Sequence, residues 1–247
     1  MKMLAFSKRC AKEISRDPLT LFFGIGFPVV LLLLLTAINK NIPAEAGNNS
    51  FALERLTPGI TVFSLSFLTL FSAMIISKDR ASSLLRRLYT TPLTAADFII
   101  GYALPFVPIA LVQCAVSYTL AFILGLAPTV NALWATLMLL PTALFFVSLG
   151  LLCGSVLTEK QVGGVCGALL TNVCGWLAGI WFDLSLVGGA FETIAGFLPF
   201  VHAVKIEQAV FAGDFGAIFP DMWWVLGYDA VTAVFAVILF TRQMKKQ

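Results

Sequence analysis

The stretch LTLFFGIGFPVVLLLLLTAI, residues Leu19–Ile38, contains no charged side chain over twenty residues. A helix rises about 1.5 Å per residue, so this length matches a hydrocarbon core roughly 30 Å thick. The apolar part of a cleaved signal peptide is the rival interpretation, because basic residues come first and Ala44-Glu45-Ala46 offers a small-residue cleavage site. Such apolar parts have only about 7–15 residues, so the stretch predicts a membrane-spanning helix.

The rest of the chain has the same character. Hydrophobic residues make up 59% of the 247 positions and charged residues 12%, against roughly 25% charged in soluble domains. Mean hydropathy is +0.93, and a water-soluble fold could not bury so much apolar surface. Five further stretches are long enough to span: Gly59–Ser77, Phe98–Leu124, Ala132–Leu157, Val162–Trp181 and Met222–Phe240. We expect an all-α membrane protein with six transmembrane helices, forming a single domain over residues 1–247.

Basic residues indicate the orientation. Cytoplasmic loops retain Lys and Arg, and thirteen of the sixteen such residues fall in alternate segments that six spans place on one side. These are Lys2, Lys8, Arg9, Lys12, Arg16, Lys78, Arg80, Arg86, Arg87, Lys160, Arg242, Lys245 and Lys246, against Lys40, Arg55 and Lys205 on the other side. The asymmetry predicts that both termini are cytoplasmic.

Two segments outside the spans have distinctive patterns. In residues 1–18, apolar positions recur at helical spacing opposite a basic face, which predicts an interfacial helix on the inner leaflet; a disordered basic tail is the alternative. The apolar positions are Met3, Phe6, Cys10 and Ile14. Residues 182–221 are apolar but broken at Gly188-Gly189, Pro199 and Pro220, which favours re-entrant half-helices on the external side over a soluble loop.

Groups that carry catalysis or bind metal are missing from the pattern. No Gly-Lys dipeptide occurs, which excludes a P-loop, and His202 is the single histidine. The five cysteines form no CxxC pair, and the basic residues form short blocks rather than a nucleic-acid-binding face. We therefore expect no catalytic residue, no metal site and no nucleic-acid partner.

A transport path has a few candidates within the spans. Thr61, Ser64, Thr69 and Ser72 form a polar stripe on the second span, for which helix packing is the competing interpretation. Asn172 is an uncharged polar group in the fifth span. Asp229 is the ionisable residue deepest in a span, and it is interpreted equally as a functional carboxylate or as a group near the outer interface. Gly150 and Gly154 have the GxxxG spacing that permits close helix approach.

The most distinctive cytoplasmic stretch is KDRASSLLRRLYTTPL, residues 78–93, within a loop expected over residues 78–97. It predicts a short amphipathic helix that stops at Thr91-Pro92. Leu84, Leu85 and Leu88 form an apolar patch beside Arg86 and Arg87, which suits docking into a groove of a soluble partner or binding to the inner leaflet.

This stretch resembles the loop after the second helix in ABC-2 type transporter membrane subunits. There an acidic residue, a small-residue step, a leucine- and arginine-rich helix and a Thr/Ser-Pro-Leu stop recur, although Ala81-Ser82-Ser83 stands where the family commonly has Gly. The basic N-terminus, the six spans, the short loop Thr158-Glu159-Lys160-Gln161 and the Leu198-Pro199 break follow in the family's order.

The resemblance implies the permease subunit of an exporter in the bacterial plasma membrane, with the drug or antibiotic exporters as the favoured subgroup. A separate ABC ATPase subunit would hold ATP and Mg, and a second copy or homologue of this chain would complete the membrane part. ATPase-coupling residues would be Asp79, Arg80, Leu84, Leu85, Arg86, Arg87, Leu88, Pro92, Glu159 and Lys160.

The sequence leaves alternatives open for the transported substrate and for the class of transporter. The apolar and aromatic spans favour an amphipathic or hydrophobic cargo such as a drug, a peptide or a lipid-like molecule, and polysaccharide or glycolipid export is the second choice. An ATPase-independent secondary transporter or channel would need more intramembrane charge than Asp229 supplies.

Overall fold

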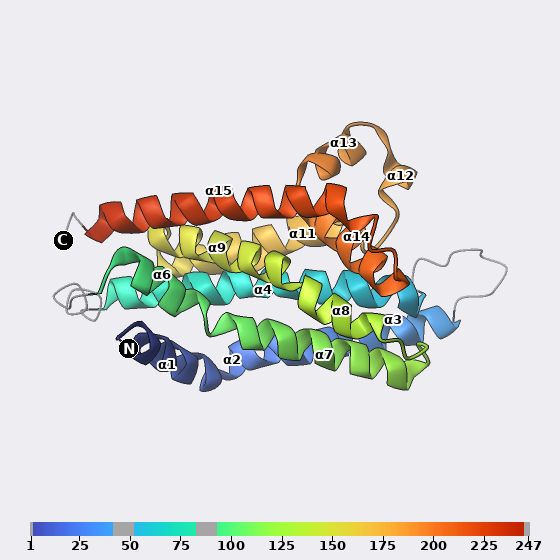
Figure 1. The fold of residues 1–247 in the computed structure, drawn as a ribbon, viewed down its shortest axis with the longest axis horizontal. Helices are drawn as coiled ribbons and strands as arrows, with labels where there is room; N and C mark the ends of the chain where they lie inside the picture. Colours follow the sequence, from blue (N-terminus) through green and yellow to red (C-terminus); the bar gives the residue numbers. More distant parts are fainter. Residues whose placement is uncertain (1, 42–51, 83–92, 245–247) are drawn as a thin grey trace.

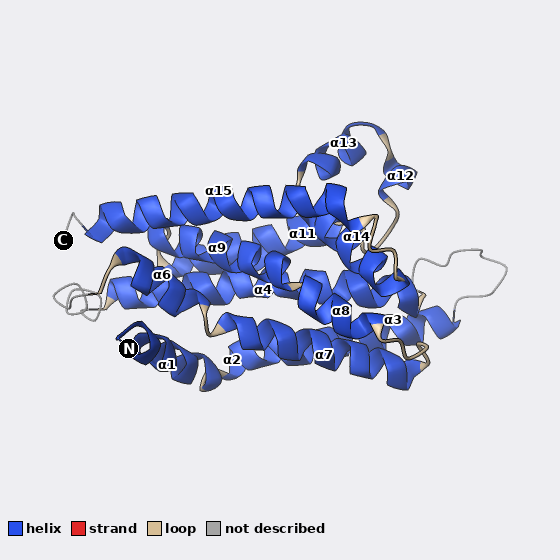
Figure 2. Cartoon of the chain, viewed as in Figure 1, coloured by secondary structure: helices blue, strands red, loops and turns tan. Residues whose placement is uncertain are grey.

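The computed structural model describes residues 2–41, 52–82 and 93–244, and within these ranges every regular element is a helix (Figures 1 and 2). Five helical runs there are long and apolar enough to cross a membrane: Pro18–Asn41, Leu53–Ala81, Ala95–Leu124, Asn131–Val156 and Ile218–Gln243. They correspond to predicted spans one to four and six. The prediction of an all-α membrane protein is confirmed.

These runs comprise several labelled elements. The first contains α2 (Pro18–Leu21), a π-helical segment η1 (Phe22–Gly26) and α3 (Phe27–Asn41), and the second is α4 (Leu53–Ala81). The third joins α6 (Ala95–Ala103) to α7 (Phe106–Leu124), the fourth joins α8 (Asn131–Met138) to α9 (Leu140–Val156), and α15 is Ile218–Met244.

The predicted fifth span is shorter than expected. It consists of α10 (Glu159–Val162), a π-helical segment η4 (Gly163–Leu170) and α11 (Thr171–Leu177). The helix ends four residues before the predicted limit of Trp181, because Gly179 adopts a left-handed φ of +70° just beyond it. This run is not among the five long spans, since charged and polar residues occupy its first turn.

The segment after the fifth run is helical and sharply broken. It contains α12 (Leu184–Val187), α13 (Gly189–Phe197) and α14 (Pro199–Ala212), and α13 and α14 meet at an angle of 77°. The break falls at Leu198-Pro199, where Pro forms the first turn of α14 and the preceding residue is extended. Helix α14 packs against α4, α8 and α15, while α12 and α13 lie at the edge (Figure 1).

Helix α4 forms the centre of the bundle. Its most apolar stretch is 89% buried, against 17% for α15, and it packs on α3, α7, α9 and α14. Helix α9 approaches it most closely, because Gly150 and Gly154 present no side chain there: a Cβ on Gly150 would lie 2.5 Å from the Thr69 carbonyl oxygen. The close approach predicted from the glycine spacing is confirmed for Gly150 and Gly154. Gly163/Gly167 and Gly175/Gly179 have the same spacing, but a Cβ on Gly163 would meet nothing within 4 Å.

The N-terminal helix α1 (Lys2–Ser15) is present as predicted, and its apolar face packs on the protein. Phe6, Cys10 and Ile14 are buried. The Phe6 ring makes edge contacts with Phe98 and Tyr102 of α6, at 5.3 and 4.8 Å between ring centroids. Gly101 permits this contact, since a Cβ there would lie 2.5 Å from the Phe6 ring. Both chain termini lie at this end of the bundle (Figure 1).

Candidate functional site

The last turn of α4 carries two residues of the predicted coupling region, Asp79 and Arg80. Arg80 donates to the carbonyl oxygens of Gly154, at 2.6 Å, and Leu157, at 3.2 Å. Carbonyls at a helix C-terminus lack intrahelical donors and carry partial negative charge, so a guanidinium satisfies them well. Arg80 thereby ties the end of α4 to the end of α9.

Asp79 is the most buried charged residue at this end, with 3% of its surface exposed. Arg9 of α1 donates to both carboxylate oxygens, at 2.5 and 2.7 Å, and the Tyr102 hydroxyl of α6 donates at 2.8 Å. A buried carboxylate costs several kcal/mol unless it is paired and hydrogen-bonded. These bonds meet that need and hold α1, α4 and α6 together.

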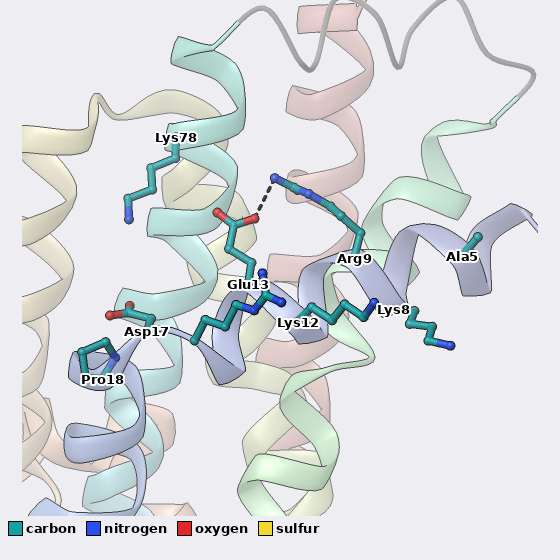
Figure 3. Close-up of a pocket in the computed structure, with 9 residues that line it drawn as sticks. Ala5, Lys8, Arg9, Lys12, Glu13, Asp17, Pro18 and Lys78 are labelled. Carbon is teal, nitrogen blue, oxygen red and sulfur yellow. Dashed lines mark ion pairs between the residues drawn. The ribbon is translucent and has the colours of Figure 1, made fainter.

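Arg9 is charged at any physiological pH. Burial by itself lowers the pKa of Arg9, but the hydrogen bond and charge of Asp79, with the charge of Glu13, raise the pKa above its ordinary value. Glu13 lies one turn further along α1 and pairs with Arg9 at 2.6 Å (Figure 3). Arg9 is therefore a fixed bridge between two carboxylates.

The short loop before α10 lies at the same end. Thr158 is the N-cap residue of α10, and its backbone N–H and its hydroxyl both donate to the side-chain oxygen of Gln161, each at 3.0 Å. Glu159 and Lys160 are exposed in the first turn, and α10 packs beside α4. The structure thus places the Glu159–Lys160 turn beside α4, and Arg80 reaches the carbonyl of Leu157 just before that turn.

The other predicted coupling residues, Leu84, Leu85, Arg86, Arg87, Leu88 and Pro92, lie outside the described residues. Their role stays a prediction.

A groove of about 740 Å³ runs along α1 next to this site (Figure 3). Its lining is mostly charged: Lys8, Arg9, Lys12, Glu13, Arg16, Asp17 and Lys78, with Ala5 and Pro18. The polar face of α1 therefore forms one wall, and the end of α4 contributes Lys78.

The predicted transport stripe of α4 is buried inside the subunit. Thr61, Ser64, Thr69 and Ser72 are all 0% exposed. Thr61 and Ser64 donate to carbonyls of their own helix, while Thr69 donates to the Phe146 carbonyl of α9 at 2.8 Å. This is the arrangement expected for helix packing, and the transport role stays a prediction.

The remaining path candidates lie apart from that stripe. Asn172 is exposed on α11 and donates to the Ala168 carbonyl one turn earlier, at 2.7 Å. Asp229 is half-buried on α15 and accepts a 2.9 Å bond from the Ser148 hydroxyl of α9. The transport role of Asn172 and Asp229 also stays a prediction.

A cleft of about 590 Å³ lies at the opposite end of the bundle from α1, between the start of α4 and α11–α14. Arg55 and Asp183 form an ion pair across it at 3.2 Å, and Glu192, Lys205 and Gln208 also line it. Hydrogen bonds with Ser185, assisted by the charge of Arg55, hold the pKa of Asp183 below its usual range. The cleft is polar and carries both signs of charge.

Helix α14 carries two buried polar residues: His202, for which a structural or exposed role was expected rather than catalysis, and Glu207, which the sequence analysis did not single out. The His202 ring contacts Asp221 Oδ1 at 2.5 Å and the Gly196 carbonyl at 2.8 Å, and it stacks on Trp224. Glu207 is 1% exposed and accepts a 3.0 Å bond from the Tyr118 hydroxyl. The signal for Glu207 was its helical spacing of seven from Phe200 and four from Ala203, both buried.

Within the part of the chain that the structure describes, no three His, Cys, Asp or Glu side chains are placed to hold a metal ion. The fold defines a polytopic helical membrane protein, and the Arg9–Asp79 and Arg80 contacts join α1, α4, α6 and α9 at one end of it. A family model for ABC-2 type transporters matches residues 1–211. The chain therefore belongs to the ABC-2 type transporter family, and it is a permease subunit rather than a nucleotide-binding one. Comparison with curated proteins found no match.

Proposed function

We propose that the chain is the membrane half of an exporter powered by ATP hydrolysis on a separate ABC ATPase subunit, which holds ATP and Mg. The observation that carries this proposal is the meeting of α1, the end of α4 and the loop before α10 at one end of the bundle. These are the segments that the predicted ATPase contact uses.

The side-chain bonds at this end supply a mechanical link. Asp79 joins α4 to α1 through Arg9 and to α6 through Tyr102, and Arg80 joins α4 to α9. A push on the loop that follows α4 would thus move four helices as one body rather than bend one helix alone. Rigid-body movement of packed elements is a common way to transmit such a change.

The assembly would contain two membrane subunits, identical or related, in the bacterial plasma membrane with all termini in the cytoplasm. The surplus of Lys and Arg at the end that bears α1 supports this orientation. An amphipathic or hydrophobic cargo is supported by the apolar spans together with the charged cleft at the far end, which suits a polar headgroup.

The experiment is affinity isolation of the tagged protein from its native membrane in mild detergent, with ATPase activity measured on the isolate. The test variants are Leu85→Asp with Leu88→Asp, and Glu159→Lys with Lys160→Glu. The matched control is Lys40→Glu, an exposed charge at the opposite end of the bundle.

We expect a nucleotide-binding subunit to co-purify with the wild type and the control, and to be lost from the test variants. Tryptophan fluorescence should show that every variant stays folded. Isolation of intact protein without any ATPase would refute the proposal and favour an ATPase-independent transporter or channel.

A further inference from the structure

The groove along α1 carries more positive charge than the protein itself neutralises. Of its lining residues five are cationic and two acidic. Arg9 is bound to Glu13 and Asp79, and Asp17 caps α2 by accepting from the Leu19 N–H and the Thr20 hydroxyl. Both acidic groups are thus engaged.

Four cations remain: Lys8, Lys12, Arg16 and Lys78. All four are exposed, and none forms an ion pair within 4 Å with a described residue. In Figure 3, Lys8 and Lys12 extend from α1, while Lys78 extends from α4 above Asp17. The groove therefore offers several N–H donors with no acceptor in the subunit.

Apolar surface adjoins the groove. A small cleft of about 40 Å³ shares Glu13, Asp17 and Lys78 with it and is otherwise lined mainly by Ile14 of α1 and by Phe71, Met74 and Ile75 of α4. Just beyond Pro18, Leu19 and Phe22 are 62% and 50% exposed. Cationic and apolar surfaces thus adjoin at the point where the first span begins and the second ends.

This position coincides with the depth of lipid headgroups. The first span starts at Pro18, and the last turn of α4 contains Lys78. Lys and Arg at the end of a span lie in the interfacial region, where phosphates are found.

We propose that this groove binds an anionic phospholipid, with the phosphate among Lys12, Arg16 and Lys78 and an acyl chain along the exposed Leu19 and Phe22. Anionic lipids are selected over zwitterionic ones, because the choline cation of phosphatidylcholine would face a surface that is already positive. An acidic segment of a partner protein would neutralise the same cations but would leave the exposed apolar residues uncovered.

The bound lipid would also steady the helix that holds Asp79. Lys12 and Arg16 lie on or next to α1, and Lys78 belongs to α4, so one phosphate would bridge the two helices next to the Arg9–Asp79 pair. The site does not depend on the exporter proposal, since it needs only the membrane and the described residues.

The test is native mass spectrometry of the purified full-length protein in detergent, titrated with palmitoyl-oleoyl phosphatidylglycerol or with palmitoyl-oleoyl phosphatidylcholine. The test variant combines Lys12→Gln, Arg16→Gln and Lys78→Gln. The rescue variant combines Lys12→Arg and Lys78→Arg and keeps Arg16, so that all three positive charges are preserved. The control is Lys40→Gln, at the other end of the bundle. A third arm adds inorganic phosphate in excess.

Each basic residue near an anionic lipid surface contributes about a fivefold gain in binding. We therefore expect the triple variant to weaken retention of phosphatidylglycerol by more than roughly twentyfold, while the control and rescue variants retain it. Inorganic phosphate should not displace the lipid, because it makes no apolar contact with Leu19 and Phe22.

Equal binding of the two lipids would overturn the proposal, as would equal retention by wild type and triple variant. Displacement by inorganic phosphate would also overturn it, by showing a simple anion site. If the triple variant keeps its lipid but releases an ATPase subunit, the groove is instead a protein docking surface. Unchanged thermal unfolding of the triple variant without added lipid confirms that it remains folded.

Discussion

Arg9→Met removes the guanidinium that holds Asp79 and leaves a buried carboxylate bonded to Tyr102. Removing one partner of a buried ion pair costs about 3–5 kcal/mol. The Arg9 side chain is 35% exposed, so water enters more easily than in a sealed core. We therefore expect the variant to lose roughly 2–3 kcal/mol of stability, which is at or just below the lower limit of that range.

The assay is thermal unfolding in detergent without added phospholipid, followed through the five tryptophans. For a chain of this size the loss corresponds to a fall in Tm of about 4–12 °C. Lys12→Met, an exposed position on the same helix, is the matched control and should change Tm by less than about 2 °C, since exposed charges contribute little.

A double variant separates the ion pair from general damage to α1. Asp79→Asn keeps an acceptor for the Tyr102 hydroxyl but removes the buried charge. Adding it to Arg9→Met should therefore restore stability, with a coupling free energy of about 1–2 kcal/mol between the two positions. If the double variant is as unstable as the sum of the two single changes, the pair does not act as described and the reasoning fails.

Two other predictions test the packing around α4 and α1. Gly150→Ala should destabilise the protein by about 1–3 kcal/mol, because its Cβ would overlap Ser72 Oγ and the Thr69 backbone. The control is Gly227→Ala on α15, whose Cβ would meet nothing within 4 Å. This control should be neutral or slightly stabilising in the same unfolding assay. Burial raises the pKa of the Cys10 thiol to about 12, so the thiol stays protonated at about pH 8. Mass spectrometry should therefore find Cys10 unalkylated by iodoacetamide until the protein is unfolded. Rapid alkylation of the folded protein would show that α1 is not packed as seen.

The long helices were predictable because a membrane-spanning helix needs an uninterrupted apolar stretch of about twenty residues, which is visible in the local sequence. Leu19–Ile38 lies inside the observed run Pro18–Asn41, and the third span ends at Leu124 as predicted, followed by Gly125 with a φ of +116°. A helix makes its backbone hydrogen bonds within the segment, so such a stretch is stable in the hydrocarbon core whichever helices surround it. Periodicity alone also predicted α1, since its basic and apolar residues separate at helical spacing.

The fifth run and α14 depended on more than local sequence. Backbone conformation at Gly179 ended α11 early, and an apolar stretch does not show where a helix will stop. Residues 182–221, which include Glu207, were predicted to form re-entrant half-helices on the external side, but the sequence did not show that Glu207 would be buried beside Tyr118 of α7.

For the site, the sequence by itself determined which residue types are available at each end of the bundle, because charge patterning and span count are properties of the chain order. Asp79, Arg80, Glu159 and Lys160 were named as coupling residues by the resemblance of their segments to ABC-2 type membrane subunits, and that role stays a prediction. The partners were decided only by the tertiary structure: Arg9 and Asp79 are seventy positions apart, and Arg80 meets the end of α9 through helix packing. Whether a polar side chain faces a partner or solvent depends on how helices rotate against one another, and that rotation follows from close packing at positions such as Gly150 and Gly101.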